Sequence, residues 1–133
     1  MSTPKQPLVL IVDDLPDLVA LMARILAPEG YRLITAMSGE EALSVAAAQT
    51  EPIDLLLTDL QMPGMTGRVL SRELLKSQPR MKVLYQTGHC DELFGYATLL
   101  EDHEAFIEKP LSPPRVREAV ALHLFGTICA PAR

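Results

Sequence analysis

Residues 53–67 read IDLLLTDLQMPGMTG, and this stretch decides the fold. The apolar run from Leu55 to Leu57 has no polar alternation, which is typical of a strand covered on both faces of a parallel sheet. The run leads to one carboxylate, Asp59, and then to a turn at Pro63 and Gly64 rather than to a helix. In an open parallel sheet, ligands bind beyond the carboxyl ends of the strands. Asp59 is therefore either a ligand-binding residue or the first residue of an ordinary turn.

Size and composition indicate a folded protein of one domain. The chain has 133 residues, of which 48% are hydrophobic and 22% charged. This is enough for one hydrophobic core and too little for two, so we expect a single domain over 1–133 with its core at about 7–125. No apolar run approaches the ~20 residues of a membrane span, and no secretory signal is evident. We therefore expect a cytoplasmic protein without membrane insertion.

The charge and the cysteines exclude several classes of function. The formal net charge is −5, whereas a nucleic-acid surface needs a basic stripe to displace counterions from phosphates. Cys90 and Cys129 occur without a CxxC spacing or a histidine cluster. Zinc sites and disulfide frameworks need more sulfur than this. We expect reduced cysteines and no direct contact with nucleic acid.

Further apolar segments alternate along the chain with amphipathic ones. The expected strands span 8–12, 31–36, 53–59, 81–86 and 105–108, and the expected helices lie at 15–27, 38–49, 66–79, 93–100 and 112–125. This alternation predicts right-handed crossovers and one parallel sheet with helices on both faces. The fold class is α/β, a flavodoxin-like doubly wound sheet of five strands in the order 2-1-3-4-5.

The helix starts and buried faces can also be predicted. Ser38 and Glu41 have the spacing of a capping box, and Thr66 and Ser112 stand where an N-cap is needed. Apolar residues at helical spacing predict three buried faces. They comprise Leu18, Leu21, Met22 and Ile25 in the first helix, Val69, Leu70 and Leu74 in the third, and Val116, Val120 and Leu124 in the last.

Polar residues follow four of the predicted strands at the point where each strand ends. Asp13 and Asp14 follow the first strand, Asp59 ends the third, Thr87 the fourth and Lys109 the fifth. The carboxyl ends of parallel strands share one rim, and strands one and three are neighbours in the predicted order. Carboxylates this close repel one another, and a bound Mg²⁺ ion would relieve that repulsion with the oxygen ligands it prefers.

The same rim offers the parts needed to hold a phosphoryl group. The hydroxyl of Thr87 and the ammonium of Lys109 would bind its oxygens, Asp59 would act as nucleophile, and Gly88 would leave room at the backbone. Taken singly, the residues could be helix caps, turn residues or surface charges. Their joint placement at four strand ends favours the functional interpretation.

Four sequence blocks, LVLIVDD, TDLQMPGMTG, YQTG and IEKP, occur in this order. With them the chain resembles the receiver domain of two-component response regulators over essentially its whole length. The resemblance implies that Asp59 accepts a phosphoryl group from a sensor histidine kinase or phosphotransfer protein. It implies Mg²⁺ bound directly by Asp14, Asp59 and the backbone carbonyl of Gln61, with Asp13 acting through water. It assigns the phosphoryl oxygens to Thr87 and Lys109.

The resemblance also implies a switch and an output surface. When Thr87 moves toward the phosphoryl group, Phe106 turns inward, and the face formed by the fourth helix, fifth strand and fifth helix changes its binding preference for an unknown downstream protein. The same face could pair two copies of the chain. Gln61, Gly88 and His89 border the pocket and would influence the lifetime of the phosphate. The local wording resembles receivers attached to hybrid sensor kinases.

Three hypotheses follow for the function. The first is a phosphorylation-controlled interaction domain that handles its own phosphate slowly and is not otherwise an enzyme. The second is a Mg²⁺-dependent phosphohydrolase that works through an aspartyl phosphate, which the presence of Gln61 in place of a second acid disfavours. The third is a constitutive binding domain, a pseudo-receiver, which is disfavoured because no acidic or lysine position of the pattern is lost.

Overall fold

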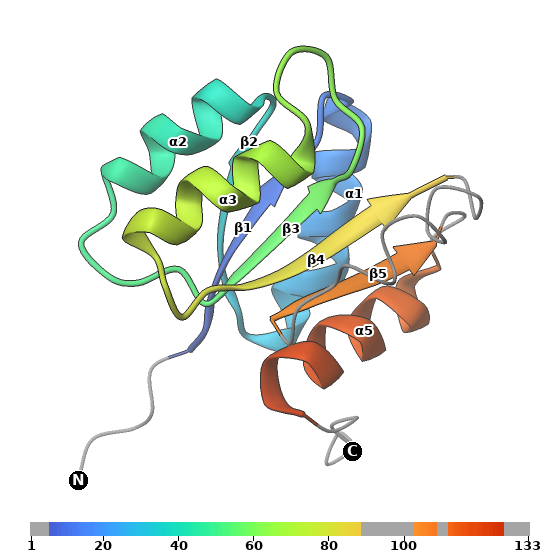
Figure 1. Ribbon diagram of the computed structural model, residues 1–133. Coiled ribbons are helices and arrows are strands. Elements are labelled where there is room, and N and C mark those ends of the chain that lie inside the picture. Colours follow the sequence, from blue (N-terminus) through green and yellow to red (C-terminus); the bar gives the residue numbers. More distant parts are fainter. Residues whose placement is uncertain (1–5, 89–102, 109–111, 127–133) are drawn as a thin grey trace, which may run out of the picture.

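The computed structural model describes residues 6–88, 103–108 and 112–126. It contains one parallel sheet of five strands in the order β2-β1-β3-β4-β5, as the sequence predicts (Figure 1). The strands are β1 (Leu8–Val12), β2 (Arg32–Ala36), β3 (Leu55–Asp59), β4 (Lys82–Thr87) and β5 (Glu104–Glu108). β1, β3 and β4 lie at the centre of the sheet, which explains the uninterrupted apolar or aromatic runs at 8–12, 55–57 and 83–85.

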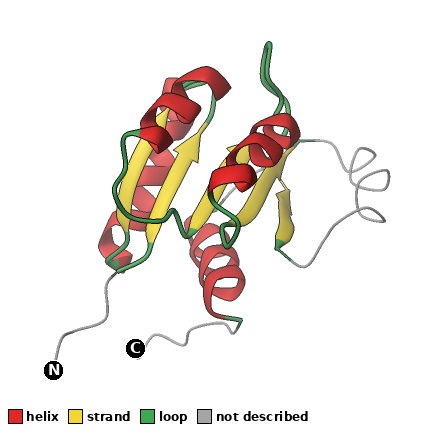
Figure 2. Cartoon of the chain, turned by 60° about the vertical axis from the view of Figure 1, so that its left-hand side comes forward, coloured by secondary structure: helices red, strands yellow, loops and turns green. Residues whose placement is uncertain are grey.

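Helices cover both faces of the sheet (Figure 2). The described helices are α1 (Pro16–Leu26), the 3₁₀ turn η1 (Ala27–Glu29), α2 (Gly39–Ala47), α3 (Gly67–Ser77) and α5 (Pro113–Phe125). One core cluster joins the sheet to α2 and α3, and the other joins it to α1 and α5. The helix expected at 93–100 lies outside the described residues.

The predicted helix caps are confirmed. The hydroxyl oxygen of Ser38 accepts a hydrogen bond from the backbone N–H of Glu41 at 3.0 Å. Thr66 and Ser112 each accept one from the amide three residues later, at 3.2 and 3.4 Å. The Glu41 carboxylate accepts from the N–H of Met37 at 2.6 Å, one residue before the amide that a standard capping box engages.

The buried faces of the helices differ in part from the prediction. In α1 the buried residues are Val19, Met22, Ile25 and Leu26, whereas Leu18 and Leu21 are only partly buried. The buried stripe is rotated because α1 packs against α5 as well as against the sheet.

One further apolar position was predicted wrongly as core. Val69 in α3 is 47% exposed, because the face of α3 that meets the sheet carries Gly67, Leu70, Ser71 and Leu74 at helical spacing. In α5 the predicted face is confirmed, since Val116 and Val120 are buried and Leu124 is partly buried against the same core cluster.

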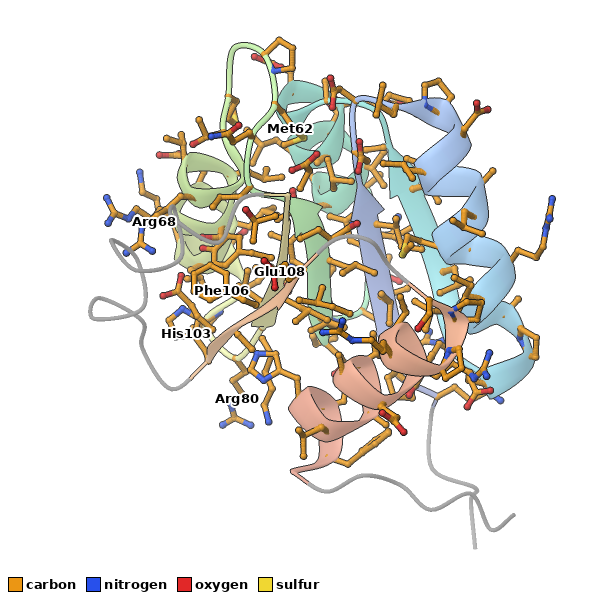
Figure 3. All side chains as sticks on the ribbon, turned by 90° about the vertical axis from the view of Figure 1, so that its right-hand side faces the viewer. Met62, Arg68, Arg80, His103, Phe106 and Glu108 are labelled. Carbon is orange, nitrogen blue, oxygen red and sulfur yellow. The ribbon has the colours of Figure 1, made fainter. Side chains whose placement is uncertain are left out.

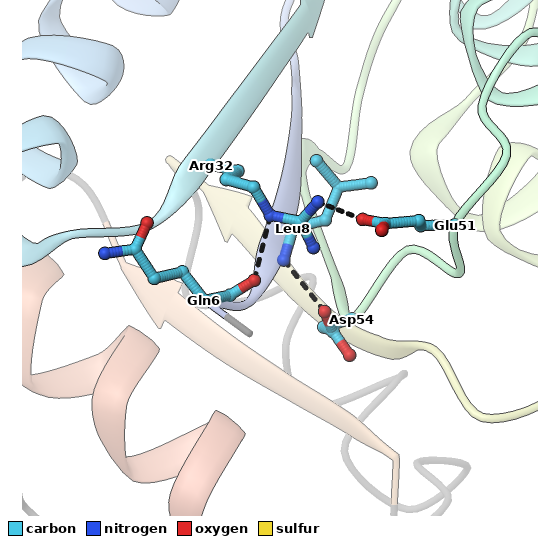
Figure 4. A network of polar contacts seen from close by, with 5 residues as sticks. All are labelled: Gln6, Leu8, Arg32, Glu51 and Asp54. Carbon is cyan, nitrogen blue, oxygen red and sulfur yellow. Dashed lines mark hydrogen bonds and ion pairs between the residues drawn. The ribbon is translucent and has the colours of Figure 1, made fainter. Parts of the chain in front are cut away.

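A polar network joins the amino-terminal ends of β1, β2 and β3 (Figure 4). The guanidinium of Arg32 donates to the backbone oxygen of Gln6 at 3.0 Å and to the carboxylate of Glu51. The N–H of Leu8 donates to a carboxylate oxygen of Asp54 at 2.8 Å. These contacts anchor β1, β2 and the segment before β3 at the amino-terminal end of the sheet, opposite the end that carries Asp59.

Candidate functional site

The pairing of β1 with β3 brings three carboxylates together at the carboxyl end of the sheet. The register places Val12 beside Thr58, so the residues that follow, Asp13 and Asp59, lie next to each other. Carboxylate oxygens of Asp13, Asp14 and Asp59 all lie within 4.8 Å of one another. Asp13 is fully buried, Asp59 is 7% exposed and Asp14 is partly exposed. The cluster is therefore set into the rim of the sheet with one side open.

Short-range hydrogen bonds fix the orientation of two of these carboxylates. One oxygen of Asp13 accepts from the N–H of Leu15 at 3.0 Å, where the chain turns from β1 into α1. Oδ1 of Asp59 accepts from the N–H of Gln61 at 3.1 Å, as in an Asx turn. Asp59 therefore does begin a turn, which was the alternative to a ligand-binding role. The turn orients the Asp59 carboxylate, so the two interpretations are compatible.

The backbone around Asp59 is held from two sides. The N–H of Leu60 donates to the backbone oxygen of Gln86 on β4 at 2.9 Å, and the N–H of Gly67 donates to the backbone oxygen of Leu60 at 3.0 Å. A Cβ atom on Gly67 would lie 2.3 Å from the backbone oxygen of Asp59. Glycine is therefore required where the amino terminus of α3 meets the end of β3.

The three carboxylates have the composition of a site for a hard cation. Among the described residues, they are the one group of His, Cys, Asp or Glu side chains that could hold a metal. The group contains neither histidine nor cysteine, so its donors suit Mg²⁺ or Ca²⁺ rather than zinc. A divalent ion would also offset the mutual repulsion of carboxylates at this separation.

Beside the carboxylate cluster, β4 and β5 place Thr87 and Phe106 on the face that α3 covers. Thr87 ends β4 and is 2% exposed. The ring of Phe106 on β5 is partly buried (Figure 3). Its centroid lies 5.9 Å from that of the Tyr85 ring, and the two planes are tilted by 42°. Since side chains two residues apart on a strand share a face, Thr87 and Tyr85 lie on the same side as Phe106.

Tyr85 joins α3 to β5 through its hydroxyl group. The hydroxyl donates to a carboxylate oxygen of Glu104 at 2.6 Å and lies 2.8 Å from the hydroxyl of Ser71. Burial, and then the hydrogen bond to Glu104, raises the pKa of Tyr85 well above its ordinary value. The phenol therefore remains a neutral donor. The ring of Tyr85 packs against the ring of Phe106.

The remaining predicted site residues can be placed only in part. Gln61 and Gly88 are exposed and lie two residues and one residue after the strand ends at Asp59 and Thr87, as expected of residues that border a pocket. The role of the Gln61 carbonyl as a metal ligand stays a prediction. Lys109 and His89 lie outside the described residues.

Two residues at the site were not identified from the sequence. Gly67 was expected only as part of a turn, although its close approach to Asp59 makes it essential to the site. Gln86 was treated as the last residue of a strand, yet it is fully buried and pairs in register with Asp59. A polar residue inside the apolar run KVLYQT was the signal that could have identified it.

Comparison with known proteins agrees with this geometry. The sequence model of the response regulator receiver domain matches residues 9–121. The chain belongs to this family. A receiver domain protein from Clostridium thermocellum has the same fold, with a TM-score of 0.78, 26% identity, and coverage of 89% of this chain and 94% of that one.

Receiver relatives occur in two kinds of larger protein. The transcriptional regulatory protein GlrR of Escherichia coli is 36% identical over 111 residues, which is 84% of this chain and 24% of that protein. The sensor kinase CckA of Brucella abortus is 32% identical over 104 residues, or 78% of this chain and 11% of that protein. This receiver therefore spans a quarter or less of the length of these two relatives.

Within the described part of this receiver, no helix combines the length and the apolar character that crossing a membrane requires.

Proposed function

We propose that this receiver accepts a phosphoryl group on Asp59 from the phosphohistidine of a sensor histidine kinase or phosphotransfer protein, in a Mg²⁺-dependent reaction. The observation that carries the proposal is the convergence of Asp13, Asp14 and Asp59 at the ends of β1 and β3, in a chain of the receiver family. Phosphorylation then changes which protein binds to the domain.

The chemistry is an in-line transfer between two nucleophiles. An oxygen of the Asp59 carboxylate attacks the phosphorus, and the bond between phosphorus and the imidazole nitrogen of the donor breaks. The nitrogen keeps the electron pair of that bond. The N–H of Gln61 fixes the rotation of the Asp59 carboxylate, which favours one approach of the donor.

Magnesium would be held by Asp14 and Asp59, with Asp13 behind them, and would supply positive charge for the phosphoryl oxygens. The depth of Asp13 and Asp59 keeps these charges in a medium of low polarity, where electrostatic interactions are stronger than in water. The proposal also assigns phosphoryl oxygens to Thr87 and Lys109.

The proposed switch uses the face between β4, β5 and α5. Movement of Thr87 toward the phosphoryl group would make space behind it, and Phe106 would turn into that space. Phe106 also lines a surface groove of about 340 Å³ together with Glu108, Arg115 and Leu122. A change in the Phe106 ring would therefore alter the shape of a surface that a partner could contact.

The assignment of Asp59 is tested with two matched variants. The wild-type receiver is incubated with acetyl phosphate and Mg²⁺, and intact mass spectrometry detects the added phosphoryl group. Asp59→Asn should abolish labelling. Asp54→Asn makes the same substitution at the opposite end of the sheet, where the amide oxygen can still accept from Leu8, and should be labelled normally. Equal labelling of Asp59→Asn and wild type would contradict the proposal.

The proposed switch is tested with beryllofluoride, which mimics the bound phosphoryl group. In Mg²⁺, wild type should show changed amide NMR signals at Thr87 and Phe106, and Asp59→Asn should not. Unchanged signals in wild type would favour a constitutive binding domain. Repeated turnover of added phosphoesters would instead indicate a phosphohydrolase.

A further inference from the structure

Gln86 is a buried polar side chain for which the fold gives no evident use. It is the fifth residue of β4 and is 0% exposed. Neither its amide nitrogen nor its amide oxygen has a hydrogen-bond partner in the described structure. Buried polar groups are nearly always paired, since an unmade hydrogen bond costs the full desolvation of the group. An unpaired amide at this position therefore calls for an explanation.

The register of the sheet places this amide beside Asp59. Gln86 is the direct partner of Asp59 on β3 and of Ile107 on β5. Residues paired across parallel strands point to the same face, and here that face is the one covered by α1 and α5, to which Leu84 and Ile107 contribute. The backbone oxygen of Gln86 also accepts from the N–H of Leu60, directly after Asp59.

Buried polar side chains on the opposite face of the sheet are paired. Ser71 lies 2.8 Å from the hydroxyl of Tyr85, and the hydroxyl of Thr58 donates to the backbone oxygen of Asp59 at 3.0 Å. A methionine would fill the same volume without an amide to satisfy. The polar group at position 86 costs stability in the resting state, which suggests a role in a different state.

We propose that Gln86 is a positioning residue for the phosphoacceptor. Its amide N–H, unpaired in the resting receiver, donates a hydrogen bond to the carboxyl group of Asp59 when the phosphoryl group is bound. This inference rests on the proposed function. Thr87, the next residue in the chain, is the one expected to move toward the phosphoryl group, and that movement turns the backbone that carries Gln86. The amide then gains its partner only in the phosphorylated state.

The test compares two identical substitutions in the intact receiver. Gln86→Met removes the unpaired amide. Gln78→Met is the control. The side-chain oxygen of Gln78 accepts from the N–H of Ile53 at 3.0 Å, at the end of the sheet opposite Asp59. Thermal unfolding and the affinity for beryllofluoride in Mg²⁺ are measured for both variants and for wild type.

The Tm should change in opposite directions in the two variants, and only Gln86→Met should change the affinity for beryllofluoride. Gln86→Met should raise the Tm by about 3–6 °C, since an unsatisfied amide is removed, and should weaken beryllofluoride binding about fivefold, since one hydrogen bond is lost. Gln78→Met should lower the Tm and bind beryllofluoride as wild type does. A lower Tm for Gln86→Met, or unchanged affinity, would overturn the inference.

The side-chain amide of Gln86 gives a direct readout. Its NMR signals are identified by their loss in Gln86→Met, and they should shift on addition of beryllofluoride and Mg²⁺. Signals that stay in place while beryllofluoride binds would refute the role of Gln86 alone. A wild-type receiver that does not bind beryllofluoride would refute the proposed function and this inference together.

Discussion

Replacing Gly67 with alanine should disturb both the stability of the receiver and the position of Asp59, the proposed phosphoacceptor. The new Cβ would lie 2.3 Å from the backbone oxygen of Asp59, 3.2 Å from its carbonyl carbon and 3.1 Å from the side chain of Thr58. Two of these three neighbours are backbone atoms of β3. That strand is paired on both sides, with β1 and β4, so it cannot yield without breaking ladder hydrogen bonds.

The expected cost follows from two opposing effects. Alanine gains at most about 1 kcal/mol over glycine in a helix. Overpacking of a filled site costs about 1–3 kcal/mol, and contact with rigid backbone places Gly67 at or above the upper end. The net loss for Gly67→Ala should therefore be about 2 kcal/mol. At Gly39 the three atoms nearest to a new Cβ are Sδ, Cβ and Cγ of Met65, at 2.6–2.9 Å, and Met65 lies in the loop between β3 and α3. Because the Cβ of Met65 moves only with its backbone, Gly39→Ala should also cost about 1–3 kcal/mol, but the strain falls on this loop and not on Asp59.

Urea unfolding of wild type and of the two alanine variants measures these costs. We expect the free energy of unfolding to fall for both variants, with the same denaturant slope in all three proteins. Beryllofluoride binding should weaken in Gly67→Ala, because the displaced atom belongs to Asp59 itself, and should be unchanged in Gly39→Ala, where the contacted residue is Met65. If both variants bound the ligand equally well, or if Gly67→Ala were as stable as wild type, the proposed rigidity of this contact would be wrong.

Two other changes test the interior of the sheet. Tyr85→Phe removes the hydroxyl that joins Ser71 to Glu104 and should cost about 1–2 kcal/mol in urea unfolding, so unchanged stability would argue against that bridge. His123, whose Nε2 lies 2.9 Å from the backbone oxygen of Val83, has its pKa lowered by burial, so the unfolded chain binds the proton more readily. Its contribution is complete above the unfolded pKa of about 6.5 and is lost as the pH falls below that value. Between pH ~7 and ~5.5, wild type should therefore lose more stability than His123→Gln, and parallel curves would contradict this.

The sheet and the acidic end of the site could be predicted from the sequence because both depend on simple rules. Uninterrupted apolar runs such as Leu55 to Leu57 identify the central strands, and the connection rules of parallel sheets restrict their order to a few, among which is the flavodoxin-like order 2-1-3-4-5. Once β1 and β3 are neighbours, the residues after them must meet. The proximity of Asp13 and Asp59 follows from the topology, without knowledge of any side-chain conformation.

The details of packing could not be predicted because they depend on pairs of residues from different elements. Val69 was expected in the core of α3 because it is apolar, but the buried position is occupied by Ser71, whose hydroxyl meets that of Tyr85. Periodicity treats serine as a surface residue, since it cannot show that a buried tyrosine on the following strand needs a hydrogen-bond partner. Similarly, nothing local to Gly67 indicates that the backbone of Asp59 will lie against it.

The site combines a rigid backbone with side chains that are unfavourable in the resting state. Contacts from α3 and β4 fix the backbone at Asp59, while the clustered carboxylates and the unpaired amide of Gln86 each reduce stability. These two parts should respond differently to substitution. At Gly67 stability and ligand binding should fall together, because the same contact serves both. At Gln86 stability should rise while binding weakens, because the amide is useful only when the phosphoryl group is present.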